Sequence, residues 1–227
     1  IEAEYPDVTV ISNSGPDDAG TRFDELWDFN REQWQYPVII DNMLNLELLF
    51  RTTQLTGDSL YHQIAVNHAN TTLANHFRPD ASSYHVVDYD PQTGAVRMKC
   101  THQGLFDESV WSRGQAWGLY GYTMCYRFTH NPAYLTQAEK IANYFFHLPD
   151  LPKDLVPYWD MKDPAIPNSP RDASAAAIFA SGLYELSTYV PAEKSKRYQA
   201  TADKIISSLN RHYRAAEDSS KGFLLLH

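Results

Sequence analysis

Asp41 is the side chain of this sequence that is best suited to proton transfer. It follows the apolar residues Val38-Ile39-Ile40 and stands where a helix is expected to begin. Burial disfavours the charged form of a carboxyl, so an aspartate in apolar surroundings keeps its proton to higher pH and can act as a general acid. An aspartate at a helix start is also a common N-cap, and this segment alone favours that structural role.

Residues 103–117 carry a second group of candidates, suited to a sugar acid. Trp111 and Trp117 offer flat apolar faces for sugar rings, Arg113 offers paired N–H donors for a carboxylate, and Gln103 adds an amide. An arginine in such an aromatic, apolar segment needs an anionic partner, which is either an internal aspartate or a ligand. On these residues alone, an aromatic core with a structural arginine and a sugar-binding site are evenly matched.

Three further features point to structure rather than to chemistry. His85 could donate a hydrogen bond to a substrate, but without context it more often only ends a hairpin. Arg171 and Asp172 precede an alanine-rich segment and are expected to form an internal ion pair and a helix cap. The nine histidines show neither an HExxH motif nor paired ligand spacing, so the sequence predicts no catalytic metal and no cofactor.

The composition indicates a folded domain and excludes two classes of partner. The 227 residues are 43% hydrophobic, which is enough for a substantial core. The net charge is −9 and no Lys/Arg block is present, so no nucleic acid is expected as a partner. Without a run of about 18 apolar residues, no membrane span is expected either. Cys100 and Cys125 leave the compartment open between periplasm and cytoplasm, and the chain could be a monomer or a homodimer.

An internal repeat of helical hairpins is expected to position the candidates. Residues 59–76, 133–148 and 195–212 each carry a Tyr followed by an Ala four positions later, in the amphipathic pattern of outer helices. In the second copy, Gln137 falls on the polar face. Each copy follows a segment that is apolar or small almost all round, as a buried inner helix is; these segments are residues 42–55, 109–129 and 172–189. The repeat predicts concentric helical layers, which is an all-α toroid.

This arrangement is expected to bring the candidates to one rim of the toroid. The second inner helix contains three glycines, which cost about 1 kcal/mol each and therefore indicate close approach of neighbouring elements. They are Gly114, Gly118 and Gly121. Asp41, residues 107–109 and Asp172 stand where the inner helices should start, and each is a plausible cap. The first turns of the inner helices therefore share one rim.

Two long loops enter that rim and are expected to carry function. Residues 77–106 alternate polar and apolar side chains on both sides of a Pro-Gln-Thr-Gly turn, which predicts a small β-hairpin. Residues 149–171 are rich in proline and predict an extended, ordered loop. Because three hairpins do not close a ring, we expect residues 1–227 to be a single catalytic domain present as an incomplete fragment.

Six segments, taken in order, resemble a known enzyme family. They read Val-Ile-Ile-Asp-Asn-Met at 38–43, Tyr-His-Val-Val-Asp-Tyr-Asp at 84–90, Gln-Gly at 103–104, Trp-Ser-Arg-Gly-Gln-Ala-Trp-Gly-Leu-Tyr-Gly at 111–121, Val-Pro-Tyr-Trp-Asp at 156–160 and Arg-Asp-Ala-Ser-Ala-Ala at 171–176. This ordered set resembles the unsaturated glucuronyl hydrolases, glycoside hydrolase family 88, over about residues 27–227. The resemblance implies an (α/α)6 barrel, a ring of six helical hairpins whose pocket opens where the inner helices begin.

The resemblance also implies an activity and a role for each candidate. The activity is removal of a 4,5-unsaturated glucuronic acid from glycosaminoglycan fragments by hydration of the C4=C5 vinyl ether, with an unsaturated oligosaccharide and water as substrates. The implied site residues are the catalytic acid and base Asp41 and the substrate-binding residues His85, Gln103, Trp111, Arg113, Trp117 and Trp27. The family's second essential aspartate and its closing segment have no counterpart in this sequence.

Two other functions fit parts of the same pattern. A related unsaturated rhamnogalacturonyl hydrolase would use the same fold and chemistry on pectin fragments, although the residues around Arg113 favour a glucuronyl substrate. A noncatalytic helical-repeat scaffold could bind protein or glycan on one rim. Such a scaffold would need neither Asp41 nor Arg113 in a shared pocket.

Overall fold

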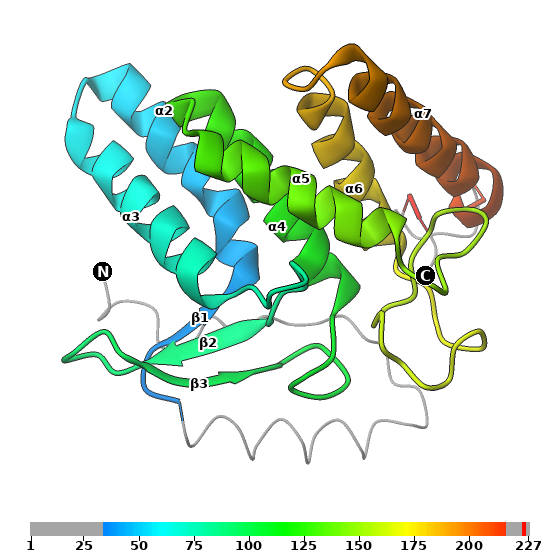
Figure 1. The fold of residues 1–227 in the computed structure, drawn as a ribbon, viewed down its shortest axis with the longest axis horizontal. Helices are drawn as coiled ribbons and strands as arrows, with labels where there is room; N and C mark the ends of the chain where they lie inside the picture. Colours follow the sequence, from blue (N-terminus) through cyan, green and yellow to red (C-terminus); the bar gives the residue numbers. More distant parts are fainter. Residues whose placement is uncertain (1–33, 217–223, 226–227) are drawn as a thin grey trace. The chain divides into compact units, whose positions relative to one another are not determined.

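The structure of the chain, a computed structural model, describes residues 34–216 and 224–225. The three predicted helical hairpins are confirmed and follow one another along the chain (Figure 1). The hairpins are α2 (Leu46–Thr56) with α3 (Ser59–Asn75), α4 (Ser112–Thr129) with α5 (Pro132–Phe146), and α6 (Ala173–Leu186) with α7 (Ala192–Ser208). Two short helices flank them: the 3-10 helix η1 (Ile40–Asn45) precedes α2, and the π-helix η2 (Leu209–Tyr213) follows α7.

Helix α4 is enclosed as its sequence predicts, but α2, which was also predicted to be buried almost all round, buries only Leu46 and Phe50. Helix α4 packs against α5, α6 and η1, and small or apolar side chains fill those three faces. In its first three turns, the positions that keep some exposure are Arg113, Trp117 and Tyr120, which lie on one face at helical spacing. The outer helix α5 is amphipathic as expected, with one correction: Gln137, assigned to the polar face, is buried.

Two glycines of α4 allow η1 to approach closely. A Cβ added to Gly114 would lie 2.9 Å from Cγ2 of Ile40, and one added to Gly121 would lie 2.4 Å from Cβ of Met43. Side chains do not tolerate such short distances, so these positions require glycine or a shift of η1. Ile40 and Met43 stand on either side of Asp41 in the chain. The two glycines therefore set how close the Asp41-bearing helix lies to α4.

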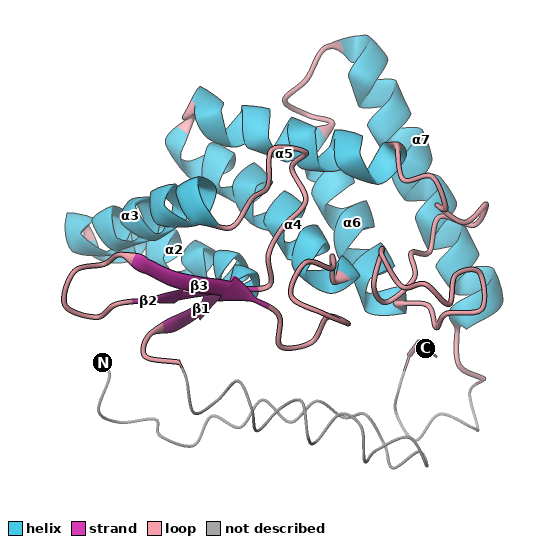
Figure 2. Cartoon of the chain, turned by 60° about the horizontal axis from the view of Figure 1, so that its bottom comes forward, coloured by secondary structure: helices cyan, strands magenta, loops and turns pink. Residues whose placement is uncertain are grey.

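The predicted β-hairpin is confirmed, and the structure adds a strand to it. β2 (Val86–Tyr89) pairs antiparallel with β3 (Val96–Cys100), and β1 (Pro37–Ile39) pairs antiparallel with the other edge of β2 (Figure 2). The sequence pattern missed β1 because three residues before a short helix are too few to show alternation. β1 leads directly into η1, so the pairing of β1 with the sheet fixes the position of Asp41.

Only one of the three predicted helix caps is confirmed. Oδ1 of Asp172 accepts a hydrogen bond from the backbone N–H of Ala175 at 2.7 Å and caps α6. Asp41 is not a cap, because neither η1 nor α2 has a side-chain cap. The expected cap at residues 107–109 is also wrong, since α4 begins only at Ser112 and has no side-chain cap.

Arg127 links α4 to two neighbouring helices, near the start of α2 and near the end of α6. It lies in the last turn of α4 and donates to Glu47 of α2 and to Glu185 of α6, each at 2.8 Å. All three side chains keep partial contact with water, so we expect each pair to contribute no more than about 1 kcal/mol.

The described residues contain neither a disulfide nor a helix that could span a membrane. No disulfide joins Cys100 and Cys125, both of which are buried. Within the described part of the chain, every helix is too short or too polar to cross a lipid bilayer. The expectation of a single domain over residues 1–227 stays a prediction.

Candidate active site

Asp41 has the environment that a general acid needs. Its side chain is 17% exposed, and Ile40 and Met43 beside it are fully buried. Burial raises the pKa of Asp41 to about 6, although its own backbone N–H and the charge of Arg113 act in the opposite direction. Oδ2 of Asp41 is buried without a hydrogen-bond partner among the described residues. The carboxyl is therefore poised to hold a proton near neutral pH and to give it up.

His85 lies next to that carboxyl, and its other ring nitrogen is held by hydrogen bonds. Its Nε2 is 3.6 Å from Oδ2 of Asp41, and its side chain is almost completely buried. The backbone N–H groups of His102 and Gln103 both donate to its Nδ1, each at 3.0 Å. Burial, together with the positive charge of His102, His76 and Arg113, holds the pKa of His85 well below its usual range. His85 is therefore a neutral imidazole at physiological pH.

Strand pairing brings Asp41 and His85 together. Ile39 of β1 pairs with Val86 of β2, and the backbone N–H of Ile40 donates to the carbonyl of His85 at 2.9 Å. His76, at the end of α3, adds a second anchor, because its Nε2 donates to the carbonyl of Val38 at 3.0 Å. Residues far apart in sequence are thus held side by side by backbone hydrogen bonds.

Arg113 has an internal anionic partner, which answers the question left open by the sequence. Its Nε and Nη2 donate to Oδ2 of Asp172 at 3.1 and 3.0 Å, and Asp172 is almost fully buried. The guanidinium stacks on the ring of Trp111 at 5.2 Å, and its side chain remains 38% exposed. One edge of Arg113 is therefore held in place, while part of the side chain stays accessible to a ligand.

The predicted Arg171–Asp172 ion pair is wrong in its partners. Arg171 instead pairs with Asp154, with Nη1 and Oδ1 3.2 Å apart. Asp172 uses its two oxygens for different tasks, one for the cap of α6 and one for Arg113. Neighbours in an extended segment point in opposite directions, so adjacent charges need not meet.

The aromatic candidates have different surroundings. Trp111 is only 5% exposed and packs its ring against His85, with centroids 4.5 Å apart. Trp117 lies one turn after Arg113 on the partly exposed face of α4 and contacts Tyr120 edge-on. Trp111 is therefore placed to restrain the His85 ring by packing. Trp117, which is partly exposed, is placed to stack on a sugar ring.

The remaining two candidates are a loop residue and a residue of the N-terminal segment. Gln103 is half-buried and adjoins His85 through its backbone N–H. Trp27 lies outside the described residues. Roles for both stay predictions.

Sequence reasoning missed the residue that shapes this loop, Asp160. Its fully buried carboxylate accepts hydrogen bonds from the hydroxyl of Ser109 at 2.5 Å and from the backbone N–H of Leu105 at 2.9 Å. Oδ1 also accepts from the backbone N–H of Val110 at 3.4 Å. The Tyr-Trp-Asp run in a proline-rich loop was a signal that could have identified it, because an aspartate that is buried among aromatic residues needs hydrogen-bond donors.

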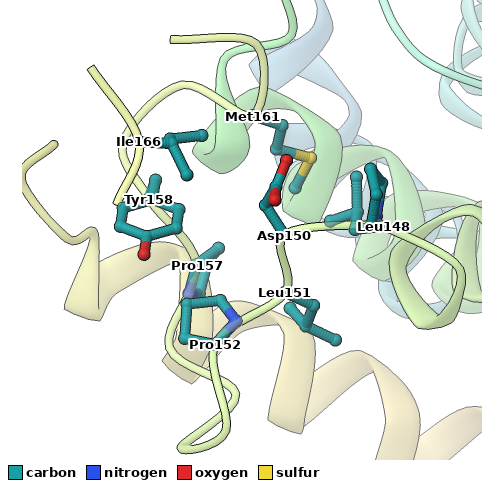
Figure 3. A pocket seen from close by; sticks show the side chains of 9 residues that line it. Leu148, Asp150, Leu151, Pro152, Pro157, Tyr158, Met161 and Ile166 are labelled. Carbon is teal, nitrogen blue, oxygen red and sulfur yellow. The ribbon is translucent and has the colours of Figure 1, made fainter. Parts of the chain in front are cut away.

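The other hollows found in the described residues are lined by none of the predicted site residues. One of them, beside the loop after α5, is small and mainly apolar (Figure 3). Its lining contains none of the predicted site residues and only one carboxyl, that of Asp150. Within residues 34–216, no three His, Cys, Asp or Glu side chains come together in a way that could hold a metal ion.

Comparisons with known proteins identify relatives of the chain. The chain is 53% identical over 202 residues to an unsaturated glucuronyl hydrolase from Formosa agariphila, a match covering 88% of this chain and 50% of that protein. It is 38% identical over 208 residues to an unsaturated chondroitin disaccharide hydrolase from Streptococcus pyogenes serotype M1, covering 90% of this chain and 51% of that protein. The chain spans about half the length of the curated relatives it matches. No family model matches it.

A solved structure gives the same result for the fold. An unsaturated glucuronyl hydrolase specific for heparin superposes with a TM-score of 0.83 at 45% identity, covering 86% of this chain and 52% of that one. The fold class is therefore all-α with a small antiparallel sheet, and the three hairpins correspond to part of an (α/α)6 barrel. By both sequence and structure, the chain belongs to the unsaturated glucuronyl hydrolase family.

Proposed function

We propose that this chain carries the proton-transfer part of a glycoside hydrolase site, as part of one catalytic domain. The enzyme would remove 4,5-unsaturated glucuronic acid from glycosaminoglycan-derived oligosaccharides. The observation that carries the proposal is the Asp41 carboxyl, which is buried, without a hydrogen-bond partner at Oδ2, and has its pKa raised to about 6. A carboxyl that only supported the fold would be expected to have its oxygens hydrogen-bonded.

The chemistry of a vinyl ether suits a single carboxyl. Asp41 would transfer its proton to C4 of the C4=C5 bond, which leaves positive charge shared by C5 and the ring oxygen. The carboxylate formed would then take a proton from the water that attacks C5, so the acid is regenerated. The resulting hemiketal opens and releases the remaining saccharide. These reaction steps balance in protons, electron pairs and atoms.

Arg113 and Trp117 would bind the substrate beside this acid. The accessible part of the Arg113 side chain suits the uronate carboxylate, because an arginine already fixed by Asp172 loses little freedom on binding. Trp117, one turn further along α4, suits stacking on a sugar ring. Water is the second substrate.

Two observations favour this function over its alternatives. The positive charge of Arg113 acts on the Asp41 carboxyl, an interaction that a noncatalytic scaffold would not need. The relatives described above are named for glucuronyl, chondroitin and heparin substrates, which favours a glycosaminoglycan fragment over a pectin fragment.

The direct test is loss of ultraviolet absorbance from unsaturated disaccharides. Hydration removes the C4=C5 bond, so we expect the protein that carries this chain to abolish the absorbance of unsaturated chondroitin, hyaluronan or heparin disaccharides. Unsaturated pectin disaccharides in the same assay measure the alternative activity. Faster loss with pectin fragments would replace the glucuronyl assignment, and no loss with any of the four would remove the enzymatic one.

The raised pKa of Asp41 predicts the pH dependence of that activity. Because the pKa is about 6, the carboxyl is mostly protonated below pH 6 and mostly ionised above it. Only the protonated form can donate to C4, so kcat/KM is expected to fall about tenfold per pH unit well above pH 6. Initial rates at low substrate concentration between pH 4.5 and 8.5 check this. A kcat/KM that rises through this range would show that the reaction begins with an ionised group.

A further inference from the structure

We propose that the turn at residues 101–104 locks His85 into the tautomer that carries its hydrogen on Nε2, so that His85 is a permanent donor facing Asp41. The proposal rests on the proposed function for its catalytic consequence, but not for its structural content. His85 would be a positioning residue for the acid, and it would neither accept nor release a proton during turnover.

The hydrogen bonds to Nδ1 determine the tautomer. A neutral imidazole has one N–H donor and one bare nitrogen that accepts. The backbone N–H groups of His102 and Gln103 can only donate, and both lie 3.0 Å from Nδ1. Nδ1 must therefore be the bare nitrogen, which leaves the hydrogen on Nε2. Nε2 has no hydrogen-bond partner among the described residues, and it lies 3.6 Å from Oδ2 of Asp41, which also has none.

The turn that supplies the two donors is itself held tightly. Oγ1 of Thr101 accepts from the backbone N–H of Gly104 at 2.8 Å, which closes the turn. A Cβ on Gly104 would lie 2.5 Å from Oγ1 of Thr101 and 2.9 Å from Oγ of Ser109, so the turn has no room for a side chain there. Asp160 holds the next residues from the other side. Both N–H groups are therefore fixed relative to the imidazole.

The surroundings of His85 disfavour a second hydrogen on the ring. Trp111 packs against it at 4.5 Å and the ring of His102 lies 6.0 Å away. The charged and titratable groups around it are Asp41, His76, His102 and Arg113, and all but Asp41 oppose an added positive charge. Protonation of Nδ1 would also place its hydrogen against the two backbone N–H groups.

A fixed donor at this position has a use in the proposed reaction. When Asp41 transfers its proton, negative charge forms on a carboxyl that has lost most of its contact with water. The Nε2–H of His85 can then close from 3.6 Å to hydrogen-bond distance and stabilise that carboxylate. A base that is stabilised and held in place can take the proton from the attacking water.

The tautomer can be measured without any substrate. Long-range ¹H–¹⁵N correlation spectra of protein labelled with ¹⁵N in its histidines distinguish a bare nitrogen from one that carries hydrogen, and His85→Gln identifies the signals of His85 by their loss. We expect His85 to show a bare Nδ1 and a protonated Nε2 throughout pH 5–8. A hydrogen on Nδ1, or titration within that range, would overturn the proposal.

Two variants test the turn and the catalytic consequence. Thr101→Val keeps the side-chain shape but removes the oxygen that closes the turn, so we expect a mixture of His85 tautomers, while Thr93→Val in the exposed β-turn leaves the spectrum unchanged. An unchanged tautomer in Thr101→Val would show that the turn does not select it.

His85→Gln retains an N–H donor that can reach Asp41, whereas His85→Ala has none. We expect kcat to fall about 10- to 100-fold in His85→Ala, the size of a lost hydrogen bond to a charged group, with partial recovery in His85→Gln. Both should keep the fall of kcat/KM above pH 6. An equal loss of kcat in the two variants would contradict the positioning role. So would a kcat/KM that no longer falls above pH 6. An enzyme inactive on every disaccharide with the expected tautomer would instead reject only the proposed function.

Discussion

Replacing Asp41 with Asn is expected to lower kcat by about 10²- to 10⁴-fold, the range attributed to a positioned acid–base group. Asn has nearly the same shape, so η1 should keep its packing against α4. The amide, however, has no acidic proton to give to C4. KM should change little because Arg113, the proposed uronate ligand, keeps its partner Asp172. Absorbance loss from the preferred disaccharide measures kcat, and substrate binding by calorimetry checks that the site survives.

The matched control for this variant is Asp58→Asn. Asp58 caps α3 at an exposed position by accepting from the backbone N–H of Leu60 at 2.8 Å, and Asn caps a helix equally well. Wild-type kinetics are therefore expected. An Asp41→Asn enzyme that also keeps wild-type turnover would show that the proton comes from another group.

Gly121→Ala is expected to damage both stability and activity, although it lies in the middle of a helix. The new Cβ would sit 2.4 Å from Cβ of Met43 and 3.3 Å from its backbone, so η1 must move. Overpacking of this kind costs about 1–3 kcal/mol, and the shift also carries Asp41 away from His85. We expect a lower urea midpoint with an unchanged m-value, and a loss of kcat that exceeds any change in KM.

Gly118→Ala separates this steric effect from the general effect of alanine in a helix. A Cβ there would meet Ile141 and Phe77 at 3.4 Å, which is an ordinary contact distance. Because alanine favours a helix over glycine by about 1 kcal/mol, this variant should be as stable as the wild type or more so. If the two variants behave alike, the close approach of η1 is not what requires glycine at 121.

The helical repeat could be predicted from the sequence because it depends on periodicity. A 3.6-residue pattern in segments such as 133–148 reports which face is buried whatever the partner is, so the three hairpins emerged with nearly correct bounds. The glycines of α4 were likewise readable, because their cost within a helix implies a neighbour. The resemblance to a family then pointed to Asp41 and Arg113, and the charge of Arg113 lowers the pKa of Asp41.

The rest depends on which distant residues pair with one another, and a single sequence does not show these pairings. The pairing of Arg113 with Asp172, the turn that orients His85 and the buried Asp160 all join separate segments. The same limit explains the error at Gln137, which is buried although local periodicity places it on the polar face of its helix.

The hydrogen bond from Ile40 to His85 makes the acid and its neighbour parts of one cooperative unit. Detaching β1 from β2 breaks that bond and carries η1 away from the imidazole in a single local opening. The proposed catalytic group is therefore in place only while the strand is docked. We expect a partly opened molecule to be inactive, because its Asp41 no longer faces His85.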